Sequence, residues 1–197
     1  MTAAPDRGAR PPVFRAAQIP NLICLLRMVL VWPIVIALIN NRFVLALVLV
    51  AVAGLSDGLD GFLAKRFNWR SRLGGILDPL ADKLLLVSTF VTLTFMALVP
   101  VWLALVVIVR DFVIVSGGLF YQAVVAPVEP EPSRVSKLNT GAQLFFICAV
   151  IGSRAFGLAG TDILTVSGAL VLVTSIVSGL DYVVSWSGKM ARARRAS

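Results

Sequence analysis

Four aspartates stand in stretches of the chain that are otherwise apolar, and their spacing indicates shared chemistry. Asp57 and Asp60 are three residues apart, and Asp78 and Asp82 are four residues apart, so on helices each pair lies on one face. An ionised side chain inside a bilayer costs at least about 2.5–3.5 kcal/mol, and acids at such positions therefore point to function. Converging carboxylates repel one another unless a cation lies between them, and Mg²⁺ or Mn²⁺ prefers oxygen ligands. The sequence therefore predicts a divalent-metal site.

Small side chains accompany these acids at helical spacing, at Gly54, Gly58, Gly61, Ala64, Gly74 and Ala81. Stripes of small residues commonly allow membrane helices to pack closely, and that interpretation stays open for the small residues taken alone. Beside four aspartates they favour a groove wide enough for a nucleotide or a phosphate.

The depth of the acids separates three hypotheses. The apolar run before Asp57, residues 43–55, is short, which puts the acids near one boundary of the membrane and favours a lipid head group. A cation or proton transporter that uses the acids as a relay is a different-class alternative, but opposing acids are lacking in the outer half of the membrane. A purely structural role is disfavoured because Lys83 and Arg110 are too few partners for four carboxylates.

The composition predicts which kind of secondary structure positions these residues. The chain has 197 residues, of which 58% are hydrophobic and 14% charged, against about 45–50% and about 25% in soluble domains. We therefore expect an all-α integral membrane protein, with about 20 residues per crossing. The chain has six apolar segments, which run roughly over 19–39, 43–64, 74–98, 100–124, 138–158 and 162–187. The breaks between them fall near Asn40-Asn41, Asn68, Pro100, the 127–132 prolines and Gly157/Gly160.

Two residue types restrict the chemistry further. The chain contains no histidine, so imidazole bases and His-ligated zinc are excluded. Cys24 and Cys148 stand far apart in apolar runs and are interpreted as small buried hydrophobes, not as a disulfide or a metal pair.

The basic residues predict the topology. Lys and Arg concentrate in a tail over 1–18, in the second-to-third and fourth-to-fifth connections, and in a basic tail over 189–197, whereas the opposite side carries only Arg42 and Arg154. By the positive-inside rule both termini are cytoplasmic, on either end of a six-helix domain over 19–188. Without a sizeable soluble domain, no nucleic-acid partner is expected.

The spaced residues form a recognisable pattern: Asp57-x-x-Asp60-Gly61-x-x-Ala64-Lys65, then, after eight residues, Gly74-x-x-x-Asp78-x-x-x-Asp82. This pattern resembles the signature of the CDP-alcohol phosphatidyltransferases. One position departs from it, because the family usually has Arg where this chain has Lys65. Lysine keeps the charge but lacks the bidentate fork that binds phosphate.

The resemblance implies a six-helix enzyme, usually a homodimer, whose active site opens to the cytoplasm. It implies two divalent cations, Mg²⁺ or Mn²⁺, held by Asp57, Asp60, Asp78 and Asp82, with Asp82 also the general base toward the acceptor hydroxyl. The reaction would transfer a phosphatidyl group from CDP-diacylglycerol and release CMP. Contacts to the CDP-lipid are implied for Asn21, Gly61, Ala64, Lys65, Ser71 and Gly74.

Shorter similarities bear on the acceptor. Residues 19–27 resemble the first helix of both phosphatidylglycerophosphate synthases and CMP-forming cardiolipin synthases, while Arg110-Asp111 and residues 136–143 look more like the cardiolipin branch. Phosphatidylglycerol is therefore the expected acceptor, with glycerol 3-phosphate as the alternative.

Three cations are candidates for binding that acceptor: Arg27, Arg110 and Lys137. The alternatives are that Arg27 snorkels to the interface, that Arg110 forms an internal ion pair, and that Lys137 is a topological anchor. Lys83 is expected to balance acid charge. A bacterial inner membrane is the expected location, because the short Pro-rich tail does not resemble a mitochondrial presequence.

Overall fold

The computed structural model describes residues 19–67, 74–124, 134–157 and 160–196, and within them the side chains of 23–56, 81–117, 135–157, 160 and 162–182. All regular structure in these ranges is helical, as predicted. The six helices are α1 (Ile19–Ile39), α2 (Phe43–Phe67), α3 (Gly74–Phe95), α4 (Val101–Val124), α5 (Arg134–Phe156) and α6 (Thr161–Ala196).

The helix ends differ from the sequence prediction in places. Helix α3 ends at Phe95, three residues short of the predicted end, because Ala97 turns the chain with a φ of 57°. Helix α5 begins four residues early, at Arg134. Helix α6 continues past the predicted end at 187 to Ala196, since the Lys, Met, Ala and Arg residues there are good helix formers.

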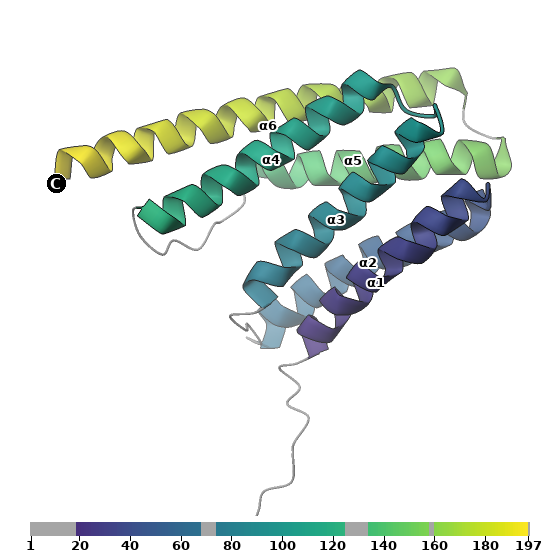
Figure 1. Ribbon diagram of the computed structural model, residues 1–197, viewed down its shortest axis with the longest axis horizontal. Helices are drawn as coiled ribbons and strands as arrows, with labels where there is room; N and C mark the ends of the chain where they lie inside the picture. Colours follow the sequence, from purple (N-terminus) through teal and green to yellow (C-terminus); the bar gives the residue numbers. More distant parts are fainter. Residues whose placement is uncertain (1–18, 68–73, 125–133, 158–159, 197) are drawn as a thin grey trace, which may run out of the picture.

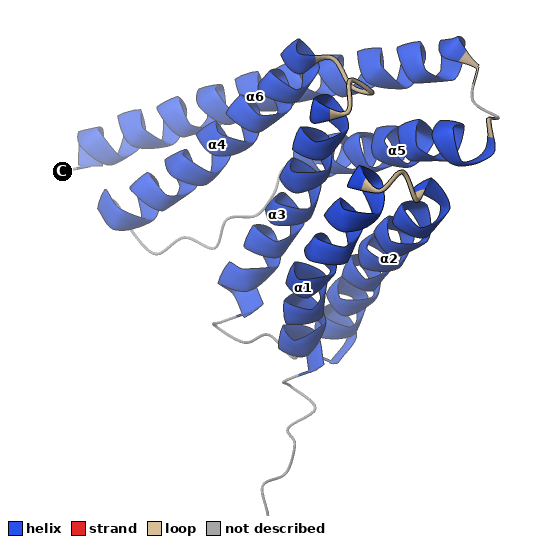
Figure 2. Cartoon of the chain, turned by 45° about the vertical axis from the view of Figure 1, so that its right-hand side comes forward, coloured by secondary structure: helices blue, strands red, loops and turns tan. Residues whose placement is uncertain are grey.

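Two helical hairpins and their neighbours make up the bundle. Helices α1 and α2 run side by side, and α3 packs against the other side of α1 (Figures 1 and 2). Helices α5 and α6 form the second hairpin, and α4 lies along α6. Contacts between α2 and α5 join the two groups. The hairpins turn at Asn41 and Gly157, both with positive φ, a conformation that these two residue types adopt more readily than most.

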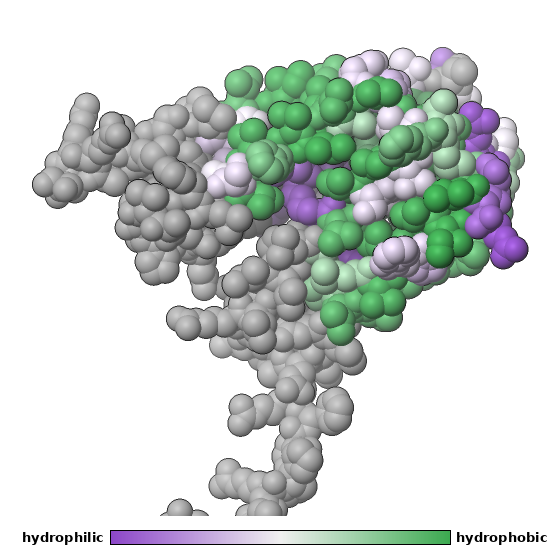
Figure 3. Space-filling model, in the orientation of Figure 1, coloured by the Kyte–Doolittle hydropathy of each residue, from purple (hydrophilic) through white to green (hydrophobic). Residues whose placement is uncertain are grey.

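Apolar side chains cover the outside of the bundle as well as its core. Trp32 is 74% exposed, Phe95 88% and Phe112 72%, and the described part of the face shown in Figure 3 is largely hydrophobic. Several polar side chains are instead buried, among them Arg27, Arg110, Asp111, Asn139 and Gln143. An apolar exterior around polar interior groups is the distribution that a lipid environment favours.

Two of the described helices are long and apolar enough to cross a bilayer. Among the described residues, Val135–Phe156 and Asp162–Tyr182 meet both requirements, and Ile23–Ile39 and Phe43–Ser56 are shorter apolar helices. Cys24 is buried, Cys148 is half-buried and neither forms a disulfide, as the sequence predicted.

Candidate functional site

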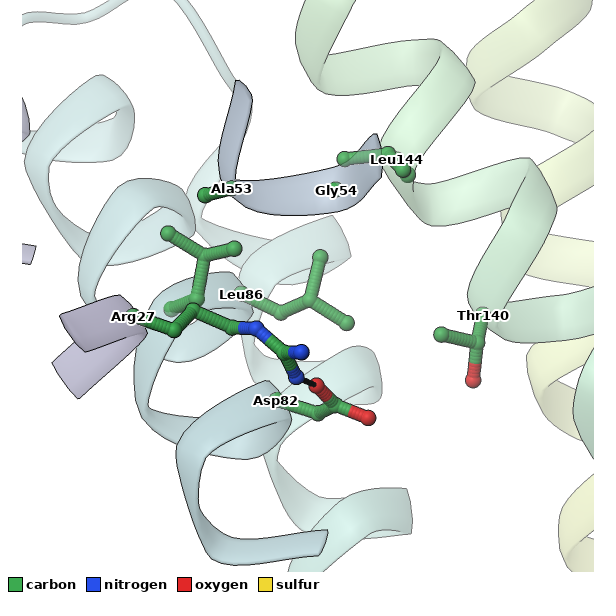
Figure 4. Close-up of a pocket in the computed structure, with 8 residues that line it drawn as sticks. Arg27, Ala53, Gly54, Asp82, Leu86, Thr140 and Leu144 are labelled. Carbon is green, nitrogen blue, oxygen red and sulfur yellow. Dashed lines mark hydrogen bonds and ion pairs between the residues drawn. The ribbon is translucent and has the colours of Figure 1, made fainter. Parts of the chain in front are cut away.

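Asp82 lies just over two turns into α3, where its carboxylate meets the guanidinium of Arg27 from α1 in an ion pair (Figure 4). The Arg27 side chain is fully buried, whereas that of Asp82 is 31% exposed. The alternative that Arg27 snorkels to the interface is therefore wrong. Asp82, which the sequence predicted to be a metal ligand and the general base, thus contacts the buried guanidinium of Arg27.

The ion pair borders a small pocket of about 40 Å³ between four helices. Helix α2 contributes Ala53 and Gly54, and α5 contributes Thr140 and Leu144, across the pocket from the ion pair (Figure 4). Leu85 and Leu86 of α3 complete the lining. The lining is mostly apolar, with the Arg27–Asp82 ion pair at one side, while Oγ1 of Thr140 donates to the carbonyl oxygen of Ser136 at 3.2 Å.

Gly54 allows α2 and α5 to approach closely at this pocket. A Cβ atom at position 54 would lie 2.9 Å from Cδ2 of Leu144. The small-residue stripe predicted on this segment therefore begins with a glycine in tight packing, which confirms the packing interpretation for that residue.

The other three aspartates belong to the same helices. Asp57 and Asp60 follow Gly54 on α2 by one and two turns, and Asp78 precedes Asp82 on α3 by one turn. Their side chains lie outside the described residues. The described side chains alone contain no cluster of three or more metal-ligating groups. The donor set fits Mg²⁺ or Mn²⁺ in chemistry, because carboxylate oxygens are the hard ligands these ions prefer.

The predicted CDP-lipid contacts also fall outside the described side chains. Asn21 lies in α1, while Gly61, Ala64 and Lys65 lie in the last turns of α2 and Gly74 begins α3. Ser71 lies outside the described residues.

A second buried polar group surrounds Arg110 and Asp111 of α4. Nη1 of Arg110 donates to Oδ1 of Asp111 at 2.6 Å, and Nη2 donates to Oγ of Ser136 on α5 at 2.9 Å and to Oγ of Ser178 on α6. Lys83 of α3 forms an ion pair with the same Asp111 oxygen. The internal ion pair proposed for Arg110 is confirmed, and the charge that Lys83 balances is that of Asp111.

Two predicted acceptor ligands thus have carboxylate partners within the bundle. Nε of Arg110 is buried and has no hydrogen-bond partner among the described residues. Lys137 is exposed in the first turn of α5, directly after Ser136. The contact between Arg110 and Ser136 therefore brings α4 to the turn that carries Lys137.

Two amides of α5 that fall within the resemblance over residues 136–143 are buried, which was not predicted from the sequence. Asn139 and Gln143 are both fully buried, and Oδ1 of Asn139 accepts from Thr174 at 2.8 Å and from Ser175 at 2.9 Å. Their spacing of four residues in an otherwise apolar helix is the signal that could have revealed them.

The described part of the chain is an all-helical bundle with an apolar exterior and ion pairs inside it. Residues 17–186 match the sequence model of the family described as CDP-alcohol phosphatidyltransferase. The chain belongs to this family, whose members are membrane-associated. The match extends over all the site residues discussed above.

Three relatives illustrate the range of the family. Human "Cardiolipin synthase (CMP-forming)" is 32% identical over 180 residues, covering 83% of this chain and 60% of the human protein. An Aquifex aeolicus "CDP-diacylglycerol--glycerol-3-phosphate 3-phosphatidyltransferase" is 32% identical over 172 residues, covering 86% of this chain and 92% of the relative. A Mycobacterium tuberculosis "Probable phosphatidylglycerophosphate synthase" is 28% identical over 192 residues, covering 93% and 88%. The chain thus spans only part of the animal relatives, 60% in the human case.

Proposed function

We propose that this protein transfers a phosphatidyl group from CDP-diacylglycerol to a glycerol-type hydroxyl and releases CMP. The observation that carries the proposal is the position of Asp82: a partly exposed carboxylate in a pocket of an apolar bundle, within the family match. The transporter alternative has less support, because the relatives above are named as synthases or as a phosphatidyltransferase.

Asp82 is the proposed general base. A carboxylate within hydrogen-bond reach of the acceptor hydroxyl takes its proton as the hydroxyl oxygen bonds to the lipid-side phosphorus. The bond from that phosphorus to the CMP oxygen breaks in the same displacement. Arg27 holds the Asp82 carboxylate from the α1 side, which limits the orientations that the base can adopt.

Asp57, Asp60, Asp78 and Asp82 are the proposed ligands of two divalent cations, Mg²⁺ or Mn²⁺. When bound, such ions neutralise the diphosphate and stabilise the leaving CMP. The aspartates of α2 and α3 supply the oxygen donors, and Asn21, Gly61, Ala64, Lys65, Ser71 and Gly74 are proposed to contact the CDP-lipid. Lys65 would provide a positive charge to the diphosphate without the planar fork of arginine.

Phosphatidylglycerol is the favoured acceptor, which would make the product cardiolipin, and glycerol 3-phosphate is the alternative. Both activities occur in the names of relatives, and the resemblance of Arg110-Asp111 and residues 136–143 to the cardiolipin branch supports the first. Lys137, Arg110 and Arg27 are the proposed cations for the acceptor phosphate.

The distribution of Lys and Arg supports the proposed topology. We propose six membrane crossings, both termini in the cytoplasm and an active site that faces the cytoplasm of a bacterial inner membrane. A homodimer is proposed from the family resemblance.

The test is CMP release from CDP-diacylglycerol by the purified protein in liposomes with Mg²⁺ or Mn²⁺. Phosphatidylglycerol and glycerol 3-phosphate are supplied in parallel, and lipid products are identified by mass spectrometry. Release with phosphatidylglycerol alone supports the favoured acceptor, whereas release with glycerol 3-phosphate alone supports the alternative. Release with neither would contradict both assignments.

A further inference from the structure

Two consecutive residues of α3 form ion pairs with different helices. Asp82 pairs with Arg27 of α1, and Lys83 pairs with Asp111 of α4. Successive residues on an α-helix diverge by about 100° around its axis, so these contacts hold α3 from two directions. The rotation of α3 about its own axis is therefore restrained at the residue next to the proposed base.

The partner of Lys83 is itself immobilised. Asp111 is 3% exposed and accepts from Arg110 at 2.6 Å. Arg110 is fixed in turn by hydroxyl groups on two further helices, Ser136 of α5 and Ser178 of α6. Lys83 thereby connects α3 to α4 directly and to α5 and α6 through two residues.

Apolar packing restrains this side of α3 less than the other side. Among the described residues, α3 packs extensively on α1 and only sparsely on α4 and α5. Burying charged groups in a membrane protein costs free energy that apolar side chains would avoid. The ion pair between Lys83 and Asp111 lies on this sparsely packed side, so it is suited to fixing the orientation of α3 relative to α4.

We infer that Lys83 and Asp111 are positioning residues for Asp82. Their ion pair sets the rotation of α3, so that the Asp82 carboxylate points into the pocket lined by Arg27 and Thr140. Neither residue contacts the substrate in this role. The expected effect on turnover rests on the proposed function, whereas the effect of the ion pair on the rotation of α3 does not.

Kinetic comparison of variants tests the role. Lys83→Met is expected to lower kcat at least tenfold while the KM for CDP-diacylglycerol stays within twofold, because the base is misdirected and the lipid site is intact. Lys83→Arg keeps the ion pair and is expected to retain kcat within threefold. The double variant Lys83→Met/Asp111→Asn is expected to be no worse than Asp111→Asn alone, since Asp111→Asn already removes the ion pair with Lys83 as well as that with Arg110.

A matched control uses a buried polar contact that does not include α3. Ser175→Ala removes a 2.9 Å hydrogen bond between α6 and Asn139 of α5, and it is expected to leave kcat within twofold. If Lys83→Met fails to fold, Lys83→Gln, which preserves a polar side chain, takes its place in each comparison.

A second readout does not depend on turnover. In an Asp82→Cys protein, the rate at which N-ethylmaleimide labels position 82 reports its direction, and peptide mass spectrometry separates it from Cys24 and Cys148. Adding Lys83→Met is expected to change that rate at least threefold, and adding Ser175→Ala is expected to leave it unchanged. A wild-type protein that releases no CMP would refute the proposed function, while the labelling rates still decide the positioning claim.

Three results would overturn the inference. They are a Lys83→Met protein with kcat within twofold of the wild type, a rise in KM at constant kcat, and a labelling rate at position 82 that Lys83→Met does not alter.

Discussion

Arg27 and Asp82 join α1 to α3 through an ion pair in which the guanidinium is fully buried and the carboxylate is 31% exposed. The two residues stand 55 positions apart in the chain, yet they border one pocket. The arrangement gives the arginine a structural task and leaves the carboxylate accessible from the pocket.

Removing the cation from this pair should destabilise the protein. Arg27→Met is expected to cost about 3 kcal/mol, at the low end for a broken buried pair because Asp82 is partly exposed. Arg27→Met/Asp82→Asn should recover part of that loss, since the uncompensated charge is also removed. Thermal unfolding in detergent measures both effects, and a double variant no more stable than Arg27→Met would contradict the coupling.

If the proposed metal site is correct, substituting a ligand aspartate weakens Mn²⁺ binding, whereas substituting an aspartate elsewhere does not. Asp57→Asn or Asp78→Asn should weaken Mn²⁺ binding at least tenfold, as measured by electron paramagnetic resonance of the free ion, because each removes a proposed ligand. CDP-diacylglycerol binding should weaken in parallel. Asp162→Asn, at the start of α6, is the control and should bind Mn²⁺ as the wild type does. Unchanged Mn²⁺ affinity in both site variants would refute the ligand assignment.

Lys137 offers a test of the acceptor site that leaves the interior intact, because its side chain is exposed. Lys137→Ala is expected to raise the KM for the acceptor about three- to tenfold, consistent with the loss of one charged contact of about 1 kcal/mol. The KM for CDP-diacylglycerol should stay within twofold. Arg154→Ala, an exposed cation in the last turn of the same helix, should change neither constant. Equal changes for both substrates in Lys137→Ala would argue against an acceptor contact.

The packing of α2 on α5 can be tested at Gly54. Gly54→Val should destabilise the protein by about 1–3 kcal/mol, the usual cost of overpacking, because its Cβ would lie 2.9 Å from Leu144. Leu144→Ala in the same protein should restore part of the loss by making room. Gly141→Val on α5 is the control for valine in a helix, since no atom lies within 4 Å of a Cβ there. If the two valine variants lose equal stability, close approach at Gly54 is not the cause.

The helices were predictable because each apolar run is bounded by residues that interrupt helices. Asn41 and Gly157 adopt positive φ values where the sequence predicted turns. The extension of α6 to Ala196 was missed, because a fall in hydropathy was taken as the end of the helix although the residues themselves favour helix. Apolarity indicates where a lipid-facing segment ends, but helix propensity continues independently of it.

Pairing between distant residues was harder to predict than the helices. The spacing of Asp78 and Asp82 predicted that they share a face, because that relationship is local. The contacts of Lys83 with Asp111 and of Arg27 with Asp82 depend on how whole helices are rotated and packed. No local spacing determines that rotation, so Arg27 was interpreted as an acceptor ligand or a snorkelling residue and its contact with the proposed base was not foreseen.

The most direct measurement compares CMP release by the wild-type protein and by Asp82→Asn, with Ser175→Ala as the control for a buried polar substitution. The wild type and Ser175→Ala should release CMP from CDP-diacylglycerol when a glycerol-type acceptor and Mg²⁺ or Mn²⁺ are present. Asp82→Asn should lose at least about 100-fold in kcat, the scale of a missing general base, while still binding CDP-diacylglycerol. An Asp82→Asn protein that turns over at near the wild-type rate would contradict the central claim.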